Sequence, residues 1–442
     1  MREDLPVDVI VLGAGFAGIT AARGIKNSGA SVTVLEARDR IGGRAWTSEL
    51  DGSKIEYGAT WIHWMQPYVW AEFQRSGLEL HEDPWFPPMT LHRNGASTSL
   101  EFDDFREKLQ RGWESFARSS ADGHLIERPY DLENLADAES LDQLSVEDAV
   151  TRLGLDDVTR DILLAEIAVQ MNAHPADVSF LSQLRWWSAS GWSLPLMIDC
   201  LARYKIDSGM SSLIEHMAQT AELDVRLEHP VAGVNQRNDL VEVTLTDGSK
   251  LHARCVVCAL PLNCIKEVEF QPPLNAEKLA LSKEEHAAKG MKVLFKTSGE
   301  AQGHAVLAPP GEKPINLLNP IRIEGDERLY VGFGTDGTAF DANDIEQVNQ
   351  VLANLHPELK ATACAGHDWH NDEYSLGTWH MPRPGQNIRT LRAFAEPEGS
   401  VYFAGDYLGK DWMGFVDGAI ESGTLTADAV ILDLKSKNAV NR

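Results

Sequence analysis

The sequence predicts an α/β protein with two domains, and three observations carry that prediction. An apolar, β-branched run from Val7 to Leu12 has the length of a strand buried in a parallel sheet. A glycine-rich turn follows at once, and a helical pattern then continues to about Asn27. The chain of 442 residues is also long enough to bury more than one hydrophobic core.

The turn reads Gly13-Ala14-Gly15-Phe16-Ala17-Gly18, a spacing that is typical of dinucleotide binding. Gly13 permits the tight turn, Gly15 lets the pyrophosphate approach the backbone, and Gly18 brings the helix against the strand. Free N–H groups at the helix N-terminus favour bound phosphate. A second strand at residues 31–35 ends at Glu36, whose carboxylate can accept hydrogen bonds from ribose hydroxyls. The segment is therefore predicted to form a Rossmann-like βαβ unit.

The residues that follow indicate which dinucleotide is bound. They read Glu36-Ala37-Arg38-Asp39-Arg40-Ile41-Gly42-Gly43-Arg44, with a glycine pair and spaced arginines directly after the ribose-binding acid. This pattern resembles a signature of the FAD-dependent amine oxidase superfamily. The resemblance implies that Glu36 and Arg38 lie near the adenosine ribose and that Arg44, beside Gly43, reaches the pyrophosphate as a forked donor. The alternative is an ordinary charged turn after an NAD-binding unit.

Other segments resemble cofactor motifs of the same superfamily, above all the C-terminal Gly405-Asp406 pair before the last predicted helix. The further FAD contacts that the resemblance implies are Phe16, Ala17, Gly58, Ala59, Thr60, Trp61, Val231, Gly405, Asp406 and Val416. Animal monoamine oxidases attach FAD through a cysteine at the position that aligns with Gly377 here. No thioether can form at a glycine, so the FAD is predicted to be non-covalent.

Lys292 is the first candidate catalytic residue. It alternates with Met291, Val293 and Phe295, so on a strand its side chain faces away from these apolar neighbours. The segment resembles the amine oxidase strand whose lysine holds a water against flavin N5, which can serve flavin reoxidation or imine hydrolysis. The alternative is a solvated strand lysine, a description that suits Lys289 and Lys296.

Trp379 and Phe415 are the other candidate catalytic residues. Each falls in a segment that resembles the superfamily motifs carrying two aromatic rings roughly perpendicular to the isoalloxazine. Such rings form a cage for an amine, because their faces stabilise positive charge on nitrogen. The resemblance also places Gln170 and Trp61 at the substrate. For each aromatic alone, packing in a hydrophobic core is the alternative.

A narrower resemblance covers nearly the whole chain. Gly58-Ala59-Thr60-Trp61-Ile62-His63-Trp64-Met65-Gln66 resembles the bacterial nicotine and pseudooxynicotine oxidases. Asn172-Ala173-His174-Pro175-Ala176-Asp177 and Pro382-Arg383-Pro384-Gly385-Gln386 are similar to segments of the 6-hydroxynicotine oxidases. Residues 80–110 and 303–325 match poorly, and they are expected to line the pocket.

The motifs predict a chain that passes repeatedly between the two domains. The FAD-binding domain is expected to comprise residues 1–85, 210–285 and 390–442, and a discontinuous α+β substrate-binding domain to comprise residues 86–209 and 286–389. Residues 86–209 have a helical pattern, whereas the later block contains strand patterns and one helix at Ile345–Leu355. The layout resembles the two-domain amine oxidase and p-hydroxybenzoate hydroxylase-like fold.

Composition and charge exclude several classes of partner. The net charge of −26 argues against nucleic acid and anionic membrane surfaces. The N-terminus carries acidic residues where a signal peptide needs basic ones, and no apolar run is long enough to span a bilayer. The expected location is therefore the cytoplasm. The sequence sets no oligomeric state, and a homodimer is one assembly that it allows.

Cysteine and histidine spacings give no metal site. Cys255 and Cys258 form a CxxC, but they lie in an apolar strand pattern, where residues three apart point to opposite faces. His367-Asp368-Trp369-His370 has no matching ligand group elsewhere, so a polar strand end is the preferred interpretation. We expect core packing for the cysteines and no metal.

These observations predict a flavin-dependent oxidase of amines. By the resemblance, a secondary or cyclic amine such as a nicotine-like alkaloid loses its α-hydrogen to FAD N5 as a hydride equivalent, and the resulting imine is hydrolysed by water. Dioxygen or a protein electron acceptor then reoxidises the flavin. One alternative is an FAD enzyme of the same fold that acts on amino acids, polyamines or a carbon–carbon bond. The more distant alternative is a flavin-binding scaffold without turnover.

Overall fold

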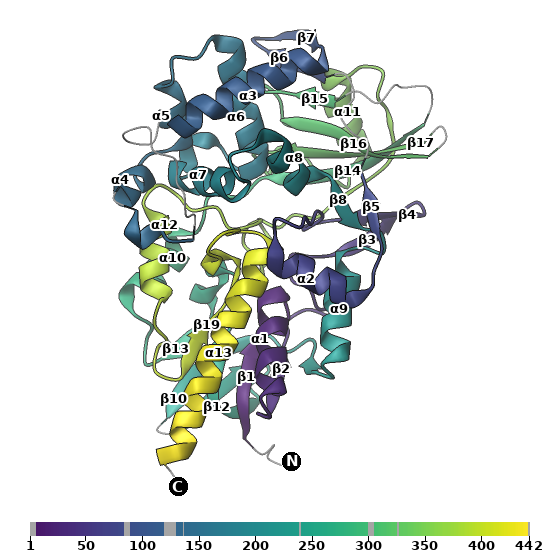
Figure 1. The fold of residues 1–442 in the computed structure, drawn as a ribbon. Helices are drawn as coiled ribbons and strands as arrows, with labels where there is room; N and C mark the ends of the chain where they lie inside the picture. Colours follow the sequence, from purple (N-terminus) through teal and green to yellow (C-terminus); the bar gives the residue numbers. More distant parts are fainter. Residues whose placement is uncertain are drawn as a thin grey trace.

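The computed structural model describes residues 6–83, 89–118, 130–135, 137–237, 240–298, 305–324 and 327–440. Two large β-sheets organise these residues, one in the lower half of the molecule beside both termini and one in the upper half (Figure 1). Helices flank each sheet, and a group of helices at the upper left packs beside the second sheet (Figure 1).

The first sheet has a parallel centre made of segments far apart in the sequence. In the described part of the chain its eight strands are β13 (Glu269–Gln271), β10 (Val231–Arg237), β11 (Leu240–Leu245), β12 (Lys250–Cys258), β1 (Val7–Leu12), β2 (Val32–Leu35) and β9 (Asp224–Arg226), with β19 (Val401–Phe403) beside β12. Strands β2, β1, β12 and β19 run parallel, so their carboxyl ends meet at one edge.

Helices cover both faces of this sheet. One face packs on α1 (Phe16–Asn27), α2 (Pro67–Ser76), α9 (Met210–Thr220) and α13 (Val416–Val440), and the other packs on α10 (Ala276–Glu284) and α12 (Gln386–Phe394). Cys255 belongs to the first of these cores and Cys258 to the second. The two thiols therefore lie on opposite faces, as the strand pattern predicts.

The second sheet is mostly antiparallel. Among the described residues its order is β18 (Ala361–Gly366), β14 (Met291–Ser298), β17 (Glu327–Gly334), β16 (Leu317–Glu324), β15 (Ala305–Leu307), β6 (Met89–Arg93) and β7 (Ala96–Leu100). Helix α11 (Ile345–Leu355) packs on one face, in the same core as Met291, Val293 and Phe295. Lys292 points to the opposite face, which confirms the alternation seen in the sequence.

The helical prediction for residues 86–209 is wrong in one part. Residues 89–100 form the hairpin β6–β7, and β6 joins β15 at the edge of the second sheet. The two-residue loop is Asn94-Gly95, and both residues have positive φ, at 51° and 72°. Asparagine and glycine tolerate this conformation, which suits the twist of a hairpin. The Asn-Gly pair was the signal in the sequence for this turn.

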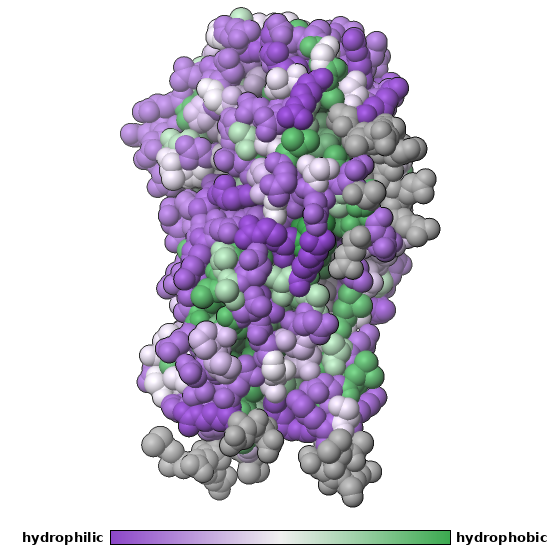
Figure 2. Space-filling view, turned by 90° about the vertical axis from the view of Figure 1, so that its left-hand side faces the viewer, coloured by the Kyte–Doolittle hydropathy of each residue, from purple (hydrophilic) through white to green (hydrophobic). Residues whose placement is uncertain are grey.

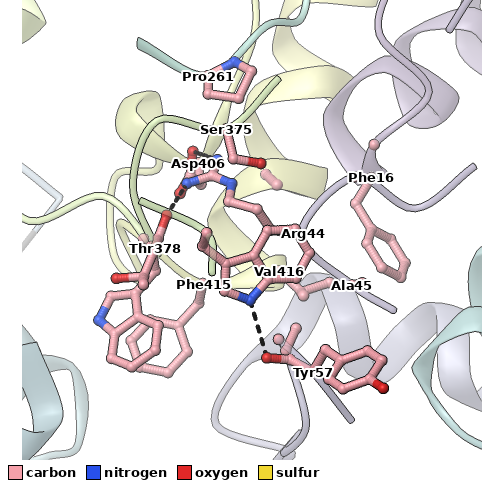
Figure 3. Close-up of a pocket in the computed structure, with 18 of the residues that line it drawn as sticks. Phe16, Arg44, Ala45, Tyr57, Pro261, Ser375, Thr378, Asp406, Phe415 and Val416 are labelled. Atoms are coloured by element: carbon pink, nitrogen blue, oxygen red, sulfur yellow. Dashed lines mark hydrogen bonds and ion pairs between the residues drawn. The ribbon is translucent and has the colours of Figure 1, made fainter. Parts of the chain in front are cut away.

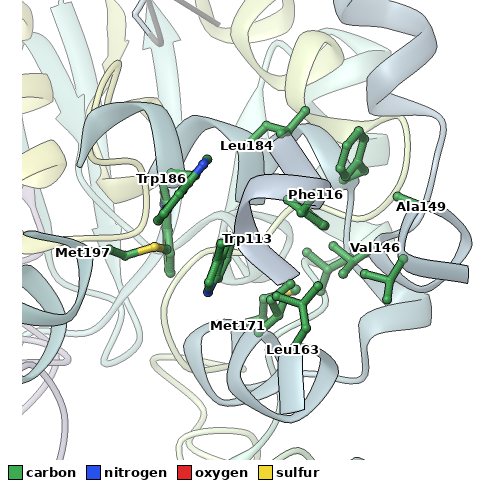
Figure 4. Close-up of a cluster of buried hydrophobic side chains, with 14 of the residues drawn as sticks. Trp113, Phe116, Val146, Ala149, Leu163, Met171, Leu184, Trp186 and Met197 are labelled. Atoms are coloured by element: carbon green, nitrogen blue, oxygen red, sulfur yellow. The ribbon is translucent and has the colours of Figure 1, made fainter. Parts of the chain in front are cut away.

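Apart from the short strand β8 (Tyr204–Ile206), the other described elements of that block are helical and surround a large aromatic core (Figure 4). Its helices are α3 (Phe102–Arg118), α4 (Ala138–Asp142), α5 (Val146–Thr151), α6 (Asp157–Met171), α7 (Phe180–Ala189) and α8 (Leu194–Ala202). The ring of Trp113 stacks on Trp187 with centroids 4.9 Å apart, and Phe116 meets Phe180 edge to face. This core fixes the position of α6, which contributes to the site described below.

Two small antiparallel pairs, β3 (Thr47–Leu50) with β4 (Ser53–Glu56) and β5 (Leu80–Glu82) with β8 (Tyr204–Ile206), complete the strands described in the structure. The residue limits of the two domains stay a prediction, and the limit at residue 85 lies outside the described residues. Helices long and apolar enough to cross a membrane are not found in the described ranges. Hydrophilic residues predominate on the face in Figure 2, with smaller hydrophobic groups between them.

Candidate active site

A cavity of about 660 Å³ opens where the parallel strands of the first sheet end. The residues directly after β1, β2 and β12 line it, namely Gly13, Glu36 and Ala259. Asp406, shortly after β19, lines it as well. The cavity continues to the face of the second sheet that carries Lys292. Ligands of open α/β sheets bind at such carboxyl edges, and the volume lies within the range of small-molecule and cofactor sites.

The glycine turn presents its backbone to the cavity. A Cβ at Gly15 would meet no atom within 4 Å, so the space beside this glycine is open to a ligand. A Cβ at Gly18 would instead lie 2.0 Å from the carbonyl oxygen of Gly13. Gly18 does not line the cavity, and it contributes close packing of α1 on β1, as the motif predicts.

Glu36 and Arg38 form the wall beyond the glycine turn. The buried carboxylate of Glu36 accepts hydrogen bonds from the backbone N–H groups of Ala14, at 2.8 Å, and Arg38, at 2.9 Å. The Arg38 guanidinium pairs with Asp372 and donates to the Ser375 hydroxyl. These contacts fix both side chains at the cavity. The sequence motif could not reveal Asp372 as a partner, because it lies 334 residues after Arg38.

Arg44 occupies the middle of the cavity wall (Figure 3). One of its terminal nitrogens lies 2.7 Å from Asp406 Oδ1, and the other donates to the carbonyl oxygen of Thr378 at 2.5 Å. Burial opposes the charge on Asp406, but Arg44 and His380 hold the pKa of this carboxyl below its ordinary value. An ionised Asp406 therefore anchors Arg44 while the rest of the guanidinium faces the cavity.

Lys292 projects from β14 into the cavity and is only 7% exposed. Its Nζ donates to the carbonyl oxygen of Gly58 at 2.9 Å and to the Thr60 hydroxyl at 2.7 Å. Burial lowers the pKa of Lys292 to about 7, although the nearby charge of Glu56 opposes this shift. A solvated strand lysine is thus excluded, because the amine is enclosed and can be neutral near physiological pH.

Aromatic rings enclose the part of the cavity next to Lys292. Trp61 and Phe333 lie 5.6 and 5.9 Å from its Nζ, and Phe333 meets Trp379 nearly edge to face. The Trp379 indole N–H donates to the backbone carbonyl oxygen of Gln170 at 3.0 Å. Phe415 packs against Trp186 with centroids 4.6 Å apart. All of these rings line the cavity. Phe333 and Trp186 were not predicted as site residues, because a strand position and a helical aromatic cluster carry no site motif.

With the exception of Gly18, every predicted site residue lines this cavity. They are Gly13, Gly15, Phe16, Ala17, Glu36, Arg38, Gly43, Arg44, Gly58, Ala59, Thr60, Trp61, Gln170, Val231, Lys292, Trp379, Gly405, Asp406, Phe415 and Val416. The poorly matching segments contribute Met89, Phe105, Leu109, Leu317 and Asn319 to the lining. Residues 84–88, 303–304 and 325 lie outside the described residues.

His367 is engaged in a local polar contact. Its Nε2 lies 2.7 Å from Asp372 Oδ2, and its ring meets Trp369 edge to face with centroids 4.2 Å apart. In the described ranges no three histidine, cysteine, aspartate or glutamate side chains are grouped so that they could hold a metal ion.

Comparison with known proteins assigns the family. A model of the flavin containing amine oxidoreductases matches residues 16–431. The chain belongs to this family. It is 34% identical to a pseudooxynicotine dehydrogenase of Pseudomonas sp over 99% of this chain and 89% of the relative. It is 31% identical to the (S)-6-hydroxynicotine oxidase of Paenarthrobacter nicotinovorans, over 96% of this chain and 99% of the relative.

The fold is also that of a known amine oxidase structure. Cyclohexylamine oxidase from Brevibacterium oxydans superposes with a TM-score of 0.81 and 22% sequence identity, over 98% of this chain and 100% of that chain. The predicted two-domain α/β fold is therefore confirmed. The protein is an FAD-dependent amine oxidoreductase, and the open space beside Gly15, the Glu36 carboxylate and the cavity face of Arg44 fit a dinucleotide.

Proposed function

We propose that this amine oxidoreductase oxidises a carbon–nitrogen bond of a secondary or cyclic amine, a nicotine-like alkaloid or a related compound, to an imine. One observation carries the proposal: an apolar, aromatic chamber joins the dinucleotide part of the cavity at Lys292, Trp379 and Phe415. The names of the two relatives above, a pseudooxynicotine dehydrogenase and a 6-hydroxynicotine oxidase, support this substrate class.

The aromatic side chains would bind and orient the amine. Trp379 is held by its hydrogen bond to Gln170, and Phe415 is held between Trp186 and Trp412, so neither ring needs to be ordered when the substrate binds. Their faces favour the positive charge that develops on nitrogen during oxidation. When bound, FAD supplies the two-electron acceptor for the hydrogen on the carbon next to nitrogen.

Lys292 would hold a water and exchange its proton. Its Nζ already donates to Gly58 and Thr60, which leaves one donor position, or a lone pair when the amine is neutral. The lowered pKa lets the side chain take up or release a proton near pH 7. This arrangement suits proton transfer to the water that hydrolyses the imine, or proton transfer during flavin reoxidation.

The arginines of the cavity argue against an amino acid substrate. Arg38 pairs with Asp372 and Arg44 pairs with Asp406. Among the described residues that line the cavity, no other arginine is present to clamp a substrate carboxylate. An amine without a carboxylate therefore fits this site better than an amino acid does.

Anaerobic mixing with an amine panel tests the proposal. The panel contains secondary and cyclic amines, primary amines, polyamines and amino acids, and flavin absorbance is followed by stopped flow. We expect secondary or cyclic amines to bleach the flavin fastest. Fast bleaching by amino acids alone, or by no member of the panel, would contradict the proposal.

The electron acceptor, the location and the assembly need separate experiments. Oxygen consumption during turnover distinguishes dioxygen from a protein acceptor. The cytoplasmic location stays a prediction from the sequence, and size-exclusion chromatography with light scattering would reveal a homodimer.

A further inference from the structure

A carboxyl group faces the aromatic end of the cavity, and the reaction outlined above does not use it. Glu166 lies on α6, one helical turn before Gln170, and both residues line the cavity. Protein surrounds Glu166, yet part of its surface stays accessible because the side chain faces the interior space. Burial raises the pKa of this carboxyl to about 7, while a hydrogen bond from Gln170 opposes the shift.

A buried amide pair orients Glu166. The Nε2 of Gln183 donates to Oε1 of Gln170 at 2.6 Å, and Gln183 is fully buried. Because Gln170 uses its oxygen to accept this bond, its own amide nitrogen is left to donate to Glu166. The carboxylate is thus held in place by a chain of hydrogen bonds that begins in the core.

The described residues provide no cation for this carboxylate. Its pKa shift has no contribution from a charged neighbour, and no ion pair with an arginine or lysine is found in the described ranges. The cations that line the cavity are engaged elsewhere, Arg38 with Asp372, Arg44 with Asp406 and Lys292 with Gly58 and Thr60. A buried, unpaired carboxylate costs free energy, and a positively charged ligand group would offset that cost.

The cavity that Glu166 lines has an apolar wall on the side of the helical block. Side chains from β6, α3 and α8 line the same cavity, namely Met89, Phe105, Leu109, Ile198 and Leu201. Glu166 precedes Gln170 by four residues, which is roughly 6 Å along the helix axis. The backbone carbonyl of Gln170 holds Trp379, so the separation along α6 places the Glu166 backbone about one helical turn from the point where the helix contacts the aromatic cage.

We propose that Glu166 binds a second, positively charged nitrogen of the substrate, so that the preferred substrates are short diamines. One nitrogen lies in the aromatic cage and is oxidised, and the other pairs with Glu166 at the far end of the chamber. This inference rests on the proposed function and narrows its substrate class from secondary or cyclic amines to those that carry a second basic nitrogen.

A matched pair of ligands tests the charge pairing directly. N-methyl-1,4-diaminobutane and N-methylpentylamine have similar length and differ by an ammonium group in place of a methyl group. The Kd of each for the oxidised holoenzyme is measured anaerobically from the change in flavin absorbance or, where the ligand reduces the flavin, from the concentration dependence of the reduction rate. We expect wild-type enzyme to bind the diamine at least about ten-fold more tightly.

Glu166→Gln removes the charge and keeps the shape of the side chain. We expect its ratio of the two Kd values to fall to about one, with an unchanged FAD content showing that the fold is intact. Glu107→Gln makes the same chemical change at an exposed position of α3 and should keep the wild-type ratio. A wild-type ratio of one, absent binding of both ligands, or a preference that survives Glu166→Gln would each overturn the inference.

The outcomes separate this inference from the proposed function. Flavin reduction by secondary or cyclic amines without any diamine preference keeps the proposed function and overturns the role of Glu166. A diamine preference that Glu166→Gln abolishes, without flavin reduction by any amine, keeps the binding site and overturns the proposed reaction. Retention of the preference in Glu166→Gln would indicate a neutral hydrogen bond, which an amide can also donate.

Discussion

At the scale of single residues, Lys292 is the group that we propose for proton transfer, and its pKa should set the pH dependence of that step. Its amine is enclosed by Trp61 and Phe333 and hydrogen-bonded to Gly58 and Thr60. Burial disfavours the charged form, which is why the pKa falls to about 7. Above that pH the neutral amine predominates, and below it the ammonium form does.

Replacing Lys292 should affect turnover without loss of the cofactor. In Lys292→Met we expect FAD to stay bound, while flavin reoxidation or product release by imine hydrolysis slows by about ten-fold to several hundred-fold. In the wild type the same step should slow as the pH falls below about 7, because the amine becomes protonated. Stopped-flow measurement of each half-reaction between pH 5 and 10 checks both points.

Lys289→Met, at a half-buried lysine paired with Glu285, is the control. Unchanged kinetics in Lys292→Met would contradict a catalytic role.

Glu56 should tune this pH dependence. Its charge raises the pKa of Lys292, and a cavity of about 30 Å³ that both residues line is large enough for a single water. Glu56→Gln removes the charge, so we expect the Lys292-dependent step to keep its rate to lower pH. The pH profile of that half-reaction checks the shift. Glu49→Gln, on the exposed side of the same small sheet, should leave the profile unchanged, and a shift toward higher pH would contradict this account.

At the scale of elements, two glycines at the turn between β1 and α1 have different surroundings. Gly18 is packed against the protein, and Gly15 faces the cavity. Gly15 adjoins open space, whereas Gly18 lies against the carbonyl oxygen of Gly13. Both glycines belong to one motif, so the two roles can be tested with the same substitution.

The two alanine variants should fail in different ways. Gly18→Ala forces α1 away from β1, and we expect about 1–3 kcal/mol lower free energy of unfolding whether or not FAD is present. Gly15→Ala should leave the unfolding of the apoprotein nearly unchanged, because its Cβ meets no protein atom, but should weaken FAD binding. Denaturant unfolding of apoprotein and FAD titration measure the two effects. Equal effects of both variants on FAD affinity and on apoprotein unfolding would contradict this separation.

At the scale of the whole molecule, the cavity joins both sheets, so bound FAD should tie them together. Its walls come from the carboxyl edge of the first sheet, from β14 and β17 of the second sheet and from α6. Ligands that bind the folded state alone stabilise it by mass action. Thermal stability is therefore expected to rise with FAD concentration.

The cofactor should be released without cleavage of a covalent bond. Residue 377 is a glycine with φ of 153°, and a Cβ there would lie 2.7 Å from His286 and 3.1 Å from the carbonyl oxygen of Ala288. The site of the thioether in animal monoamine oxidases thus has no room for a cysteine side chain here. After acid precipitation we expect free flavin in the supernatant, as seen by absorbance. Flavin that stays in the pellet would contradict the prediction.

The sequence by itself determined those features that depend on residues close together along the chain. The glycine turn and Glu36 lie close together in the sequence, so the Rossmann-like unit could be predicted from spacing. The resemblance of the segment from Glu36 to Arg44 to an amine oxidase signature implied that the dinucleotide is FAD. The β14 alternation likewise placed Lys292 opposite the core. The β6–β7 hairpin was missed because its Asn94-Gly95 turn lies inside a charged block with a helical pattern.

Only the tertiary structure decided which distant groups meet in the cavity. Arg38 and Asp372 are 334 residues apart, and the Thr60 hydroxyl that accepts from Lys292 comes from a different segment of the chain. The same holds for Glu166, whose significance depends on its enclosure and on cations that are paired elsewhere. Burial and the distance to a partner charge set these properties, and both depend on how remote segments pack rather than on local sequence.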